Sequence, residues 1–420
     1  MVAGDNPAPR EIGEIVADPF SSELVILTQS NHTVNFELTS EQQKLQTAAI
    51  EFARRELNSN MIERDAQQVF SRDGWKRCAS FGVQGMPVPK EYGGRDADPI
   101  TTIAMMEGLG YGGSDQGLLF SINAHMWTNS IPLLKYGTSE QKKKYLPGLC
   151  DGSLIGANGA SEPSAGSDIF SMQTRATKDG NHYVLNGRKI FVTNAPVADL
   201  FTLYATLDPQ LGAAGICTFV VEKGTRGLSV GKKKDKMGLR TALMAELVLE
   251  DCRVPGTALL GREGRGVEVF NCSMAWERAC ILATCLGTMQ RQLERCVEHA
   301  RRRKQFGQPI GKFQSVANRI VDMKLRYETA RLLIYKVGWL MQSDRSADMD
   351  AAMAKLYVSE SFVKSCLDAI QIHGGAGFLT GLEFEREMRD SVGSTLYSGT
   401  SEIQRNIIAR GLGDLIEGFY

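Results

Sequence analysis

Residues 183–192 read Tyr-Val-Leu-Asn-Gly-Arg-Lys-Ile-Phe-Val, and they mark the chain as more than a bundle of helices. The pair Asn186-Gly187 favours a two-residue turn, because both residues tolerate a positive φ, and the apolar residues on either side have strand character. The stretch therefore predicts a β-hairpin. Further strand patterns lie nearby, at 200–206, 216–221 and 246–249. Turn residues at close spacing predict a small sheet domain.

Helical periodicity lies on both sides of this sheet region. A helix is expected to begin at Ser40, where Ser40 and Gln43 form a capping box before an apolar pattern of helical spacing. Further helical patterns follow at 62–82, 99–111 and 139–148. Beyond the sheet region we expect four amphipathic helices, at 266–302, 315–342, 348–372 and from Ser401 onward. Short links between these four helices predict a bundle.

The order helical, β, helical predicts an α+β fold. We expect an N-terminal helical domain at 37–155, a middle β domain at 156–265 and a C-terminal four-helix bundle at 266–420. Residues 1–36 read as an extension that contains one short β-like run, at 24–27. A length of 420 residues agrees with two or three domains.

Composition argues against several classes of protein. Lys plus Arg and Asp plus Glu both number 48, and this zero net charge argues against nucleic acid or a membrane surface as a partner. No apolar run is long enough to cross a bilayer, and acidic residues near the start argue against a targeting peptide, so a cytoplasmic location is expected. The nine cysteines form no CxxC pair and the five histidines are scattered, so we expect buried reduced thiols and no metal site.

Five short motifs could bind a ligand, although each alone has an ordinary explanation as a capped turn, a packed strand end or a helix terminus. They are Ser-Glu-Pro-Ser-Ala-Gly-Ser-Asp at 161–168, Phe-Val-Thr-Asn at 191–194, Arg-Arg-Arg-Lys-Gln-Phe-Gly at 301–307, Gln-Ile-His-Gly-Gly-Ala-Gly-Phe at 371–378 and Tyr-Ser-Gly-Thr-Ser-Glu-Ile-Gln-Arg at 397–405. Their hydroxyls, free backbone N–H groups and arginines suit a heterocycle or a pyrophosphate. The glycine patterns of Rossmann and P-loop proteins are missing from the sequence.

Taken in this order, the five motifs resemble those of the acyl-CoA dehydrogenase family. The resemblance covers about residues 36–413, and the connecting stretches 141–147 and 245–255 agree with it. It implies one FAD per subunit, bound between the β domain and the C-terminal bundle, usually in a homotetramer made of two dimers. It also implies an acyl thioester as substrate, from which a base removes the α-proton while the β-hydrogen leaves as hydride to the flavin.

The resemblance assigns contacts with the cofactor. Ala160 and Ser161 would line the pyrimidine edge of the flavin, Thr193 would approach N5, Phe191 would lie beside the ring and Ser167 would face the phosphates. The other implied contacts are Arg303, Phe306 and Gln314 on an arm to the neighbouring subunit's FAD, Gln371, Gly374 and Gly375 near the adenosine, and Thr400 and Gln404 from the last helix.

The catalytic base departs from the commoner pattern of the family. Most members place a Glu in a Tyr-Glu-Gly-Thr motif, whereas this chain has Ser398 at that position. A minority place the Glu in a Glu-Arg pair on the long helix, which Glu277 and Arg278 match, so the resemblance implies Glu277 as the base. Apolar neighbours predict a raised pKa for Glu277, which suits a base near neutral pH. The backbone N–H of Ser398 would donate to the thioester carbonyl, and Arg278 would contact substrate.

The resemblance leaves the acyl group and its carrier open. Members with the base on the helix act on branched, long or cyclic acyl groups or on aminoacyl groups such as prolyl, carried by CoA or by a carrier protein's phosphopantetheine. Arg240 follows a lysine-rich stretch at 232–236 that could face a CoA phosphate or an acidic carrier domain, or could simply be solvated. Electrons would pass to an electron-transfer acceptor or to oxygen. Two other hypotheses are a flavin-dependent monooxygenase and a non-catalytic homologue.

Overall fold

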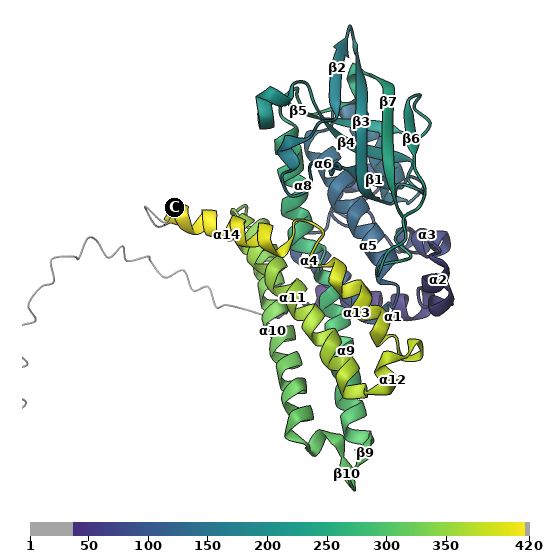
Figure 1. Cartoon of the computed structure of the whole chain (residues 1–420), viewed down its shortest axis with the longest axis vertical. Coiled ribbons are helices and arrows are strands. Elements are labelled where there is room, and N and C mark those ends of the chain that lie inside the picture. Colours follow the sequence, from purple (N-terminus) through teal and green to yellow (C-terminus); the bar gives the residue numbers. More distant parts are fainter. Residues whose placement is uncertain (1–36, 416–420) are drawn as a thin grey trace, which may run out of the picture. The chain divides into compact units, whose positions relative to one another are not determined.

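The computed structural model describes residues 37–415, so the expected extension at 1–36 and its strand at 24–27 lie outside the described residues. A helical part, a sheet and a second helical part follow one another along the chain (Figure 1). The expected α+β class is therefore confirmed. Within the described residues, no helix is both long enough and apolar enough to span a membrane.

The first helix, α1 (Ser40–Glu56), is capped one residue earlier than expected. Thr39 has extended backbone angles, and its side chain accepts a hydrogen bond from the backbone N–H of Gln42. The Gln42 side chain bonds in return to the Thr39 backbone N–H, which completes a capping box. Ser40 is already helical, so the expected box of Ser40 and Gln43 is wrong.

The helical pattern expected at 62–82 corresponds to two helices. Gln68 has a φ of 55°, in the left-handed region, and ends α2 before α3 begins at Arg72. The sequence does not predict the helices between Gln116 and Tyr136, because they are buried on nearly every side and show no polar face. The elements after α1 are α2 (Met61–Gln67), α3 (Arg72–Ser80), η1 (Lys90–Tyr92), α4 (Pro99–Gly112), α5 (Gln116–His125), the π-helical η2 (Met126–Ser130), α6 (Ile131–Tyr136) and α7 (Ser139–Cys150).

The middle part is a sheet with the strand order β6-β7-β3-β2-β4-β5-β8, in which β1 pairs in parallel with β4. Strand β4 (Leu200–Thr206) has the expected bounds. The strands expected at 216–221 and 246–249 are confirmed as parts of β5 (Ile216–Glu222) and β7 (Met244–Pro255). The other strands are β1 (Gly156–Gly159), β2 (Arg175–Asp179), β3 (His182–Thr193), β6 (Leu228–Val230) and β8 (Leu259–Leu260).

The expected hairpin at Asn186-Gly187 is wrong, because β3 runs straight through it. The Asn186 side chain instead donates to Asp251 Oδ1 at 3.2 Å and accepts from the Asp251 backbone N–H at 2.8 Å, across the pairing with β7. Gly187 lies at a register shift in that pairing, and a Cβ there would collide with Thr174. The Asn-Gly pair therefore makes an irregularity within a strand, while the chain reverses before β3, between Asp179 and His182.

The C-terminal part contains the expected helices with two differences. The helix expected at 266–302 is broken at Ile281 and Leu282 into two helices, and two short helices precede the last one. The simple bundle of four helices is therefore wrong in detail. The elements are α8 (Gly266–Cys280), α9 (Ala283–Arg302), β9 (Lys304–Gln305), β10 (Gln308–Pro309), α10 (Gln314–Gln342), α11 (Asp348–His373), α12 (Gly375–Phe378), α13 (Phe384–Gly393) and α14 (Ser401–Leu415).

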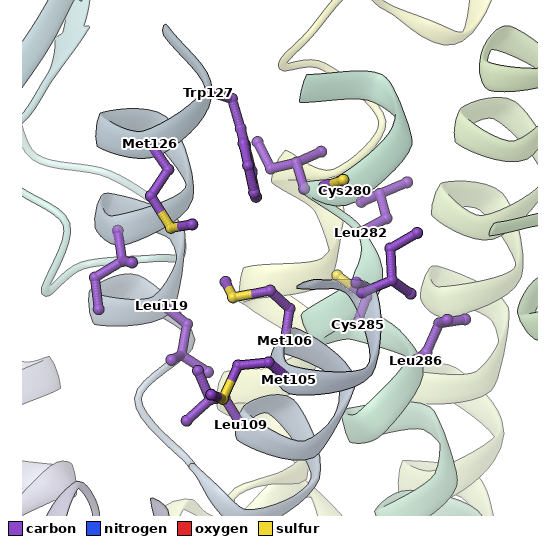
Figure 2. Close-up of a cluster of buried hydrophobic side chains, with 14 of the residues drawn as sticks. Met105, Met106, Leu109, Leu119, Met126, Trp127, Cys280, Leu282, Cys285 and Leu286 are labelled. Atoms are coloured by element: carbon purple, nitrogen blue, oxygen red, sulfur yellow. The ribbon is translucent and has the colours of Figure 1, made fainter. Parts of the chain in front are cut away.

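One apolar core joins the two helical parts. Figure 2 shows Met105 and Met106 from α4 grouped with Trp127 and with Cys285 and Leu286 from α9. All nine cysteines are buried and free, as expected. Two glycines let the backbones of α4 and α9 approach closely, because a Cβ at Gly110 would fall on the Thr284 carbonyl and one at Gly287 on the Glu107 carbonyl.

His125 joins the N-terminal helices to the sheet. Its Nδ1 accepts a hydrogen bond from the Gly156 backbone N–H at 2.9 Å, so the neutral ring carries its proton on Nε2, 2.9 Å from the Leu149 carbonyl oxygen. Trp75 packs edge-on against the ring, with centroids 5.0 Å apart. Burial lowers the pKa of His125 to about 4, and the bond to Leu149 opposes that shift.

The fold should therefore lose stability in mild acid through His125. The unfolded chain binds a proton on this ring near pH 6.5, whereas the folded protein does so only near pH 4. The neutral ring therefore contributes fully to the free energy of unfolding above pH 6.5, and this contribution is lost as the pH falls to about 4. The shift corresponds to about 3 kcal/mol at most. Urea unfolding at several pH values should show a smaller loss between pH 6.5 and 4 for His125→Gln than for the unaltered protein. An equal loss of unfolding free energy between pH 6.5 and 4 in both proteins would contradict this account.

Candidate active site

Glu277 lies on α8 and is 7% exposed. Ser398, in the turn before α14, donates from Oγ to Glu277 Oε1 at 2.8 Å. The turn is unusual, because Ser398 has a φ of 57°. Gln404 holds it in place by donating from Nε2 to the Ser398 carbonyl at 3.1 Å and to the Gly399 carbonyl at 2.8 Å. The structure thus brings together Glu277 and Ser398, which are 121 residues apart in sequence.

Positive charge surrounds this carboxylate. Arg278 donates from Nε to the Ser398 carbonyl at 3.4 Å, and Lys355 of α11 is fully buried, with no hydrogen-bond partner for Nζ among the described residues. Burial raises the pKa of Glu277, while the bond from Ser398 and then the charges of Arg278 and Lys355 oppose that rise. Burial, followed by the charge of Arg278, lowers the pKa of Lys355 to about 8. The raised pKa expected for Glu277 is confirmed in direction.

Aromatic and aliphatic side chains flank Glu277 on α8 and Ser398 in its turn. Trp276, its neighbour on α8, stacks on Trp127 with centroids 5.7 Å apart. Phe120 packs against Tyr397 at 4.6 Å. One turn beyond Glu277, Ile281 lines a small cavity, together with Gln116, Phe120, Leu239, Thr284, Cys285, Phe362, Asp390 and Tyr397. Glu277 itself is buried, and a carboxylate kept from water suits proton abstraction from carbon.

A second group of expected residues meets at one end of the sheet. The Ile190 backbone N–H donates to the Ser161 carbonyl at 2.9 Å, so the segment that follows β1 lies against the end of β3. At that end Phe191 is 67% exposed with a φ of 56°, and a register shift relative to β7 spans residues 189–192. An aromatic side chain held outward by a strained backbone fits a flat ring system such as a flavin. Ala160 and Thr193 lie in the same two segments, while Ser167 is exposed on the loop beyond.

A third group of expected residues lies around the β9–β10 ribbon, between α9 and α10. Arg303, Phe306 and Gln314 lie in and around the β9–β10 ribbon, which is found at the end of α9 and α10 that points away from the sheet (Figure 1). Phe306 is 93% exposed, with a φ of 49°. The helix end that carries Gln371, Gly374 and Gly375 is close to this ribbon, since His373 stacks on His299 at 4.2 Å and the Arg303 backbone N–H bonds to the His299 carbonyl. Within one chain the second group therefore lies at the sheet, and the third lies at the ends of helices that point away from the sheet.

The chain also matches known proteins. The N-terminal, middle and C-terminal domain models of acyl-CoA dehydrogenase match residues 39–153, 157–252 and 264–413. This chain belongs to the acyl-CoA dehydrogenase family. An L-prolyl-[peptidyl-carrier protein] dehydrogenase from a Serratia species is 43% identical over 380 residues, 90% of this chain and 98% of that protein.

Two solved structures of this family are similar over the same region. The prolyl acyl carrier protein oxidase AnaB has 52% identity and a TM-score of 0.89, over 90% of this chain and all of that one. The FAD complex of PigA has 43% identity and a TM-score of 0.88, over 90% of this chain and 99% of that one.

Some residues of this acyl-CoA dehydrogenase site escaped sequence reasoning. Lys355 reads as an ordinary helix residue, and only the fold shows that it is buried near the base. A buried ion pair between Lys189 and Glu162 was also missed, because a lysine in a strand usually points to water. No cluster of three or more potential metal ligands occurs in the part of the chain that the structure describes.

The hydrogen bond from Ser398 should lower the pKa of Glu277. Ser398→Ala removes that bond, so Glu277 should ionise at a pH about one unit higher, the effect of a charge-assisted hydrogen bond worth about 1.4 kcal/mol. The carboxyl stretch of Glu277, isolated by subtracting the infrared spectrum of Glu277→Gln, reports this titration. Ser394→Ala is the matched control, because that hydroxyl bonds to the Ser391 carbonyl. An unchanged titration in Ser398→Ala would contradict the assignment.

Proposed function

We propose that this chain is an FAD-dependent dehydrogenase of an acyl thioester, with Glu277 as the base. The observation that carries the proposal is the buried Glu277 carboxylate, bonded to Ser398 at the position where most family members carry their own Glu. The 43% identity to a prolyl-carrier-protein dehydrogenase and the FAD complex of the similar PigA support it.

Each group of residues has a part in this reaction. Glu277 takes the α-proton on Oε2 or Oε1, and Ser398 and Arg278 keep the carboxylate and its turn in position. The backbone N–H of Ser398 donates to the thioester carbonyl as the α-carbon loses its proton. Ala160, Ser161, Phe191 and Thr193 hold the flavin ring, and Ser167 lies on the phosphate side. Bound FAD supplies the hydride acceptor.

The remaining cofactor contacts come from a second copy of the chain. Arg303, Phe306 and Gln314, with Gln371, Gly374 and Gly375, belong to the β9–β10 ribbon and the helix ends beside it, which lie away from the sheet that carries the flavin-ring group (Figure 1). A neighbouring subunit can supply them, while Thr400 and Gln404 serve the subunit's own site. Helix α10 exposes an apolar row that suits such an assembly, formed by Val321, Leu325, Leu332 and Trp339.

The substrate that we propose is a prolyl group on the phosphopantetheine of a carrier protein. Relatives named for that activity include two that are 43% and 44% identical to this chain. The lysines at 232–234 are exposed, and the same loop continues to Leu239 in the cavity wall and to Arg240. Positive charge beside the cavity suits an acidic carrier domain. The free thiols fit a reducing compartment, which supports a cytoplasmic location.

Glu277→Gln tests the base directly. The amide keeps the size of the side chain and can still accept from Ser398, but it cannot take a proton from carbon, so anaerobic flavin reduction by substrate should slow by about 10²–10⁴-fold. FAD content should remain normal. Glu268→Gln, the same change at a partly exposed position of α8, is the control and should reduce the flavin at the unaltered rate. Reduction of Glu277→Gln at the unaltered rate would show that the base lies elsewhere.

Reversing charge on the 232–234 loop tests the carrier. Lys232→Glu with Lys233→Glu should lower kcat/KM for prolyl-carrier protein by about tenfold at low salt and leave prolyl-pantetheine turnover unchanged. Lys90→Glu with Lys143→Glu, at exposed lysines outside this loop, provides the matched control. Equal kcat/KM of the unaltered enzyme for acyl-CoA and for the same acyl group on carrier protein would instead support a CoA enzyme.

A further inference from the structure

A buried ion pair links the two segments of the sheet that carry the proposed flavin contacts. Lys189 Nζ lies 2.7 Å from Glu162 Oε1, and the two side chains are 0% and 3% exposed. The preceding residue of β3, Arg188, pairs with Glu246 at the same distance, but its side chain is 58% exposed. Burying two charges in place of apolar side chains rarely adds net stability, so the inner pair calls for another explanation.

Each partner also holds backbone groups. Glu162 Oε1 accepts from the Thr174 N–H at 3.0 Å, and Oε2 accepts from the Gln173 N–H at 2.6 Å. Lys189 Nζ is 3.3 Å from the Ala160 carbonyl oxygen. The pair therefore fixes the segment after β1 both to β3 and to the start of β2.

The positions of these contacts coincide with the proposed ring site. Ala160 and Ser161 directly precede Glu162, and Phe191 and Thr193 follow Lys189 at the irregular end of β3. One backbone hydrogen bond, from Ile190 to Ser161, also joins the two segments. Burial lowers the pKa of Lys189, and the charge of Glu162 with its hydrogen bond opposes that shift.

We infer that the Lys189–Glu162 pair is a positioning device that sets the distance between Ala160–Ser161 and Phe191–Thr193 and thereby determines how firmly the flavin ring is held. Neither side chain is placed against the ring, so both act through the backbone that they fix. The inference rests on the proposed function in one respect, namely that FAD is the ligand. It adds the requirement that the Lys189–Glu162 pair be intact for tight FAD binding, even when every residue that contacts the ring is present.

Removing the pair should loosen FAD while the fold survives. In Lys189→Met with Glu162→Gln both charges are absent, yet the amide oxygen can still accept from Gln173 or Thr174, and no charge is left buried alone. FAD should leave the purified holoenzyme about tenfold faster or more on dilution, followed by the rise of flavin fluorescence. The visible flavin band should also change shape, a readout that a purely structural role would not move.

The neighbouring surface pair gives the matched control. Arg188→Met removes the exposed pair with Glu246 on the same strand, and its FAD release should stay within about twofold of the unaltered rate. The single variant Lys189→Met leaves Glu162 without its cation and should release FAD at least as fast as the double variant. Thermal unfolding of each holoenzyme reports whether the fold is intact.

Two results would overturn the inference. In the first, a double variant of unaltered stability would keep the unaltered release rate and flavin spectrum. In the second, both variants that lack Lys189 would fail to fold, because the pair would then serve the fold itself. Failure of the proposed function looks different, since the unaltered protein would then purify colourless and bind no added FAD.

Discussion

Removing the Glu277 carboxylate from water is the constraint around which the catalytic part of this protein is arranged. A buried carboxylate needs donors and positive charge close by, and these come from Ser398 and Arg278, with Lys355 behind them. Ser398 reaches it from a left-handed turn, which Gln404 holds from α14. The protonation of one side chain thus depends on α8, α11 and α14 meeting correctly.

The sheet contributes in a different way. Its β3 strand pairs in register with β2, but its pairing with β7 is irregular at Gly187 and again where it approaches the ring site, so one strand both builds the core and displays Phe191 outward. Irregularity at a strand end re-aims side chains that a regular pleat would bury. Lys189, which pairs with Glu162, lies between these two irregularities of the strand.

Local sequence patterns predicted the helices and strands whose own apolar residues follow a clear period. Strand β4 was predictable because a short run of residues with strand propensity lies between turn residues. The long helices α10 and α11 were predictable because apolar residues recur at helical spacing along their whole length. The Asn-Gly pair misled, since a side-chain bond to Asp251 on another strand overrides its turn preference. The break at Ile281 and Leu282 leaves no sign, because both residues are apolar and buried like their helical neighbours.

The residues of the site also include some that were predictable from the sequence and some that were not. Glu277, Ser398 and the cofactor contacts were predictable because their motifs resemble a family, and resemblance carries residues across long distances in sequence. Lys189 and Glu162 lie 27 residues apart, and each is unremarkable alone. They form an ion pair only because two segments fold against each other. Periodicity and local motifs do not predict that contact.

The contact between α4 and α9 has a consequence for how this protein tolerates change. At Gly110 and Gly287 backbone meets backbone, so even a methyl group must push the two helices apart. Helix α9 begins next to Ile281, one turn beyond the base, and a wedge at either glycine would shift that turn as well. In a population of random variants, inactive enzymes should therefore arise at two small, chemically inert positions as readily as at the acid–base residues.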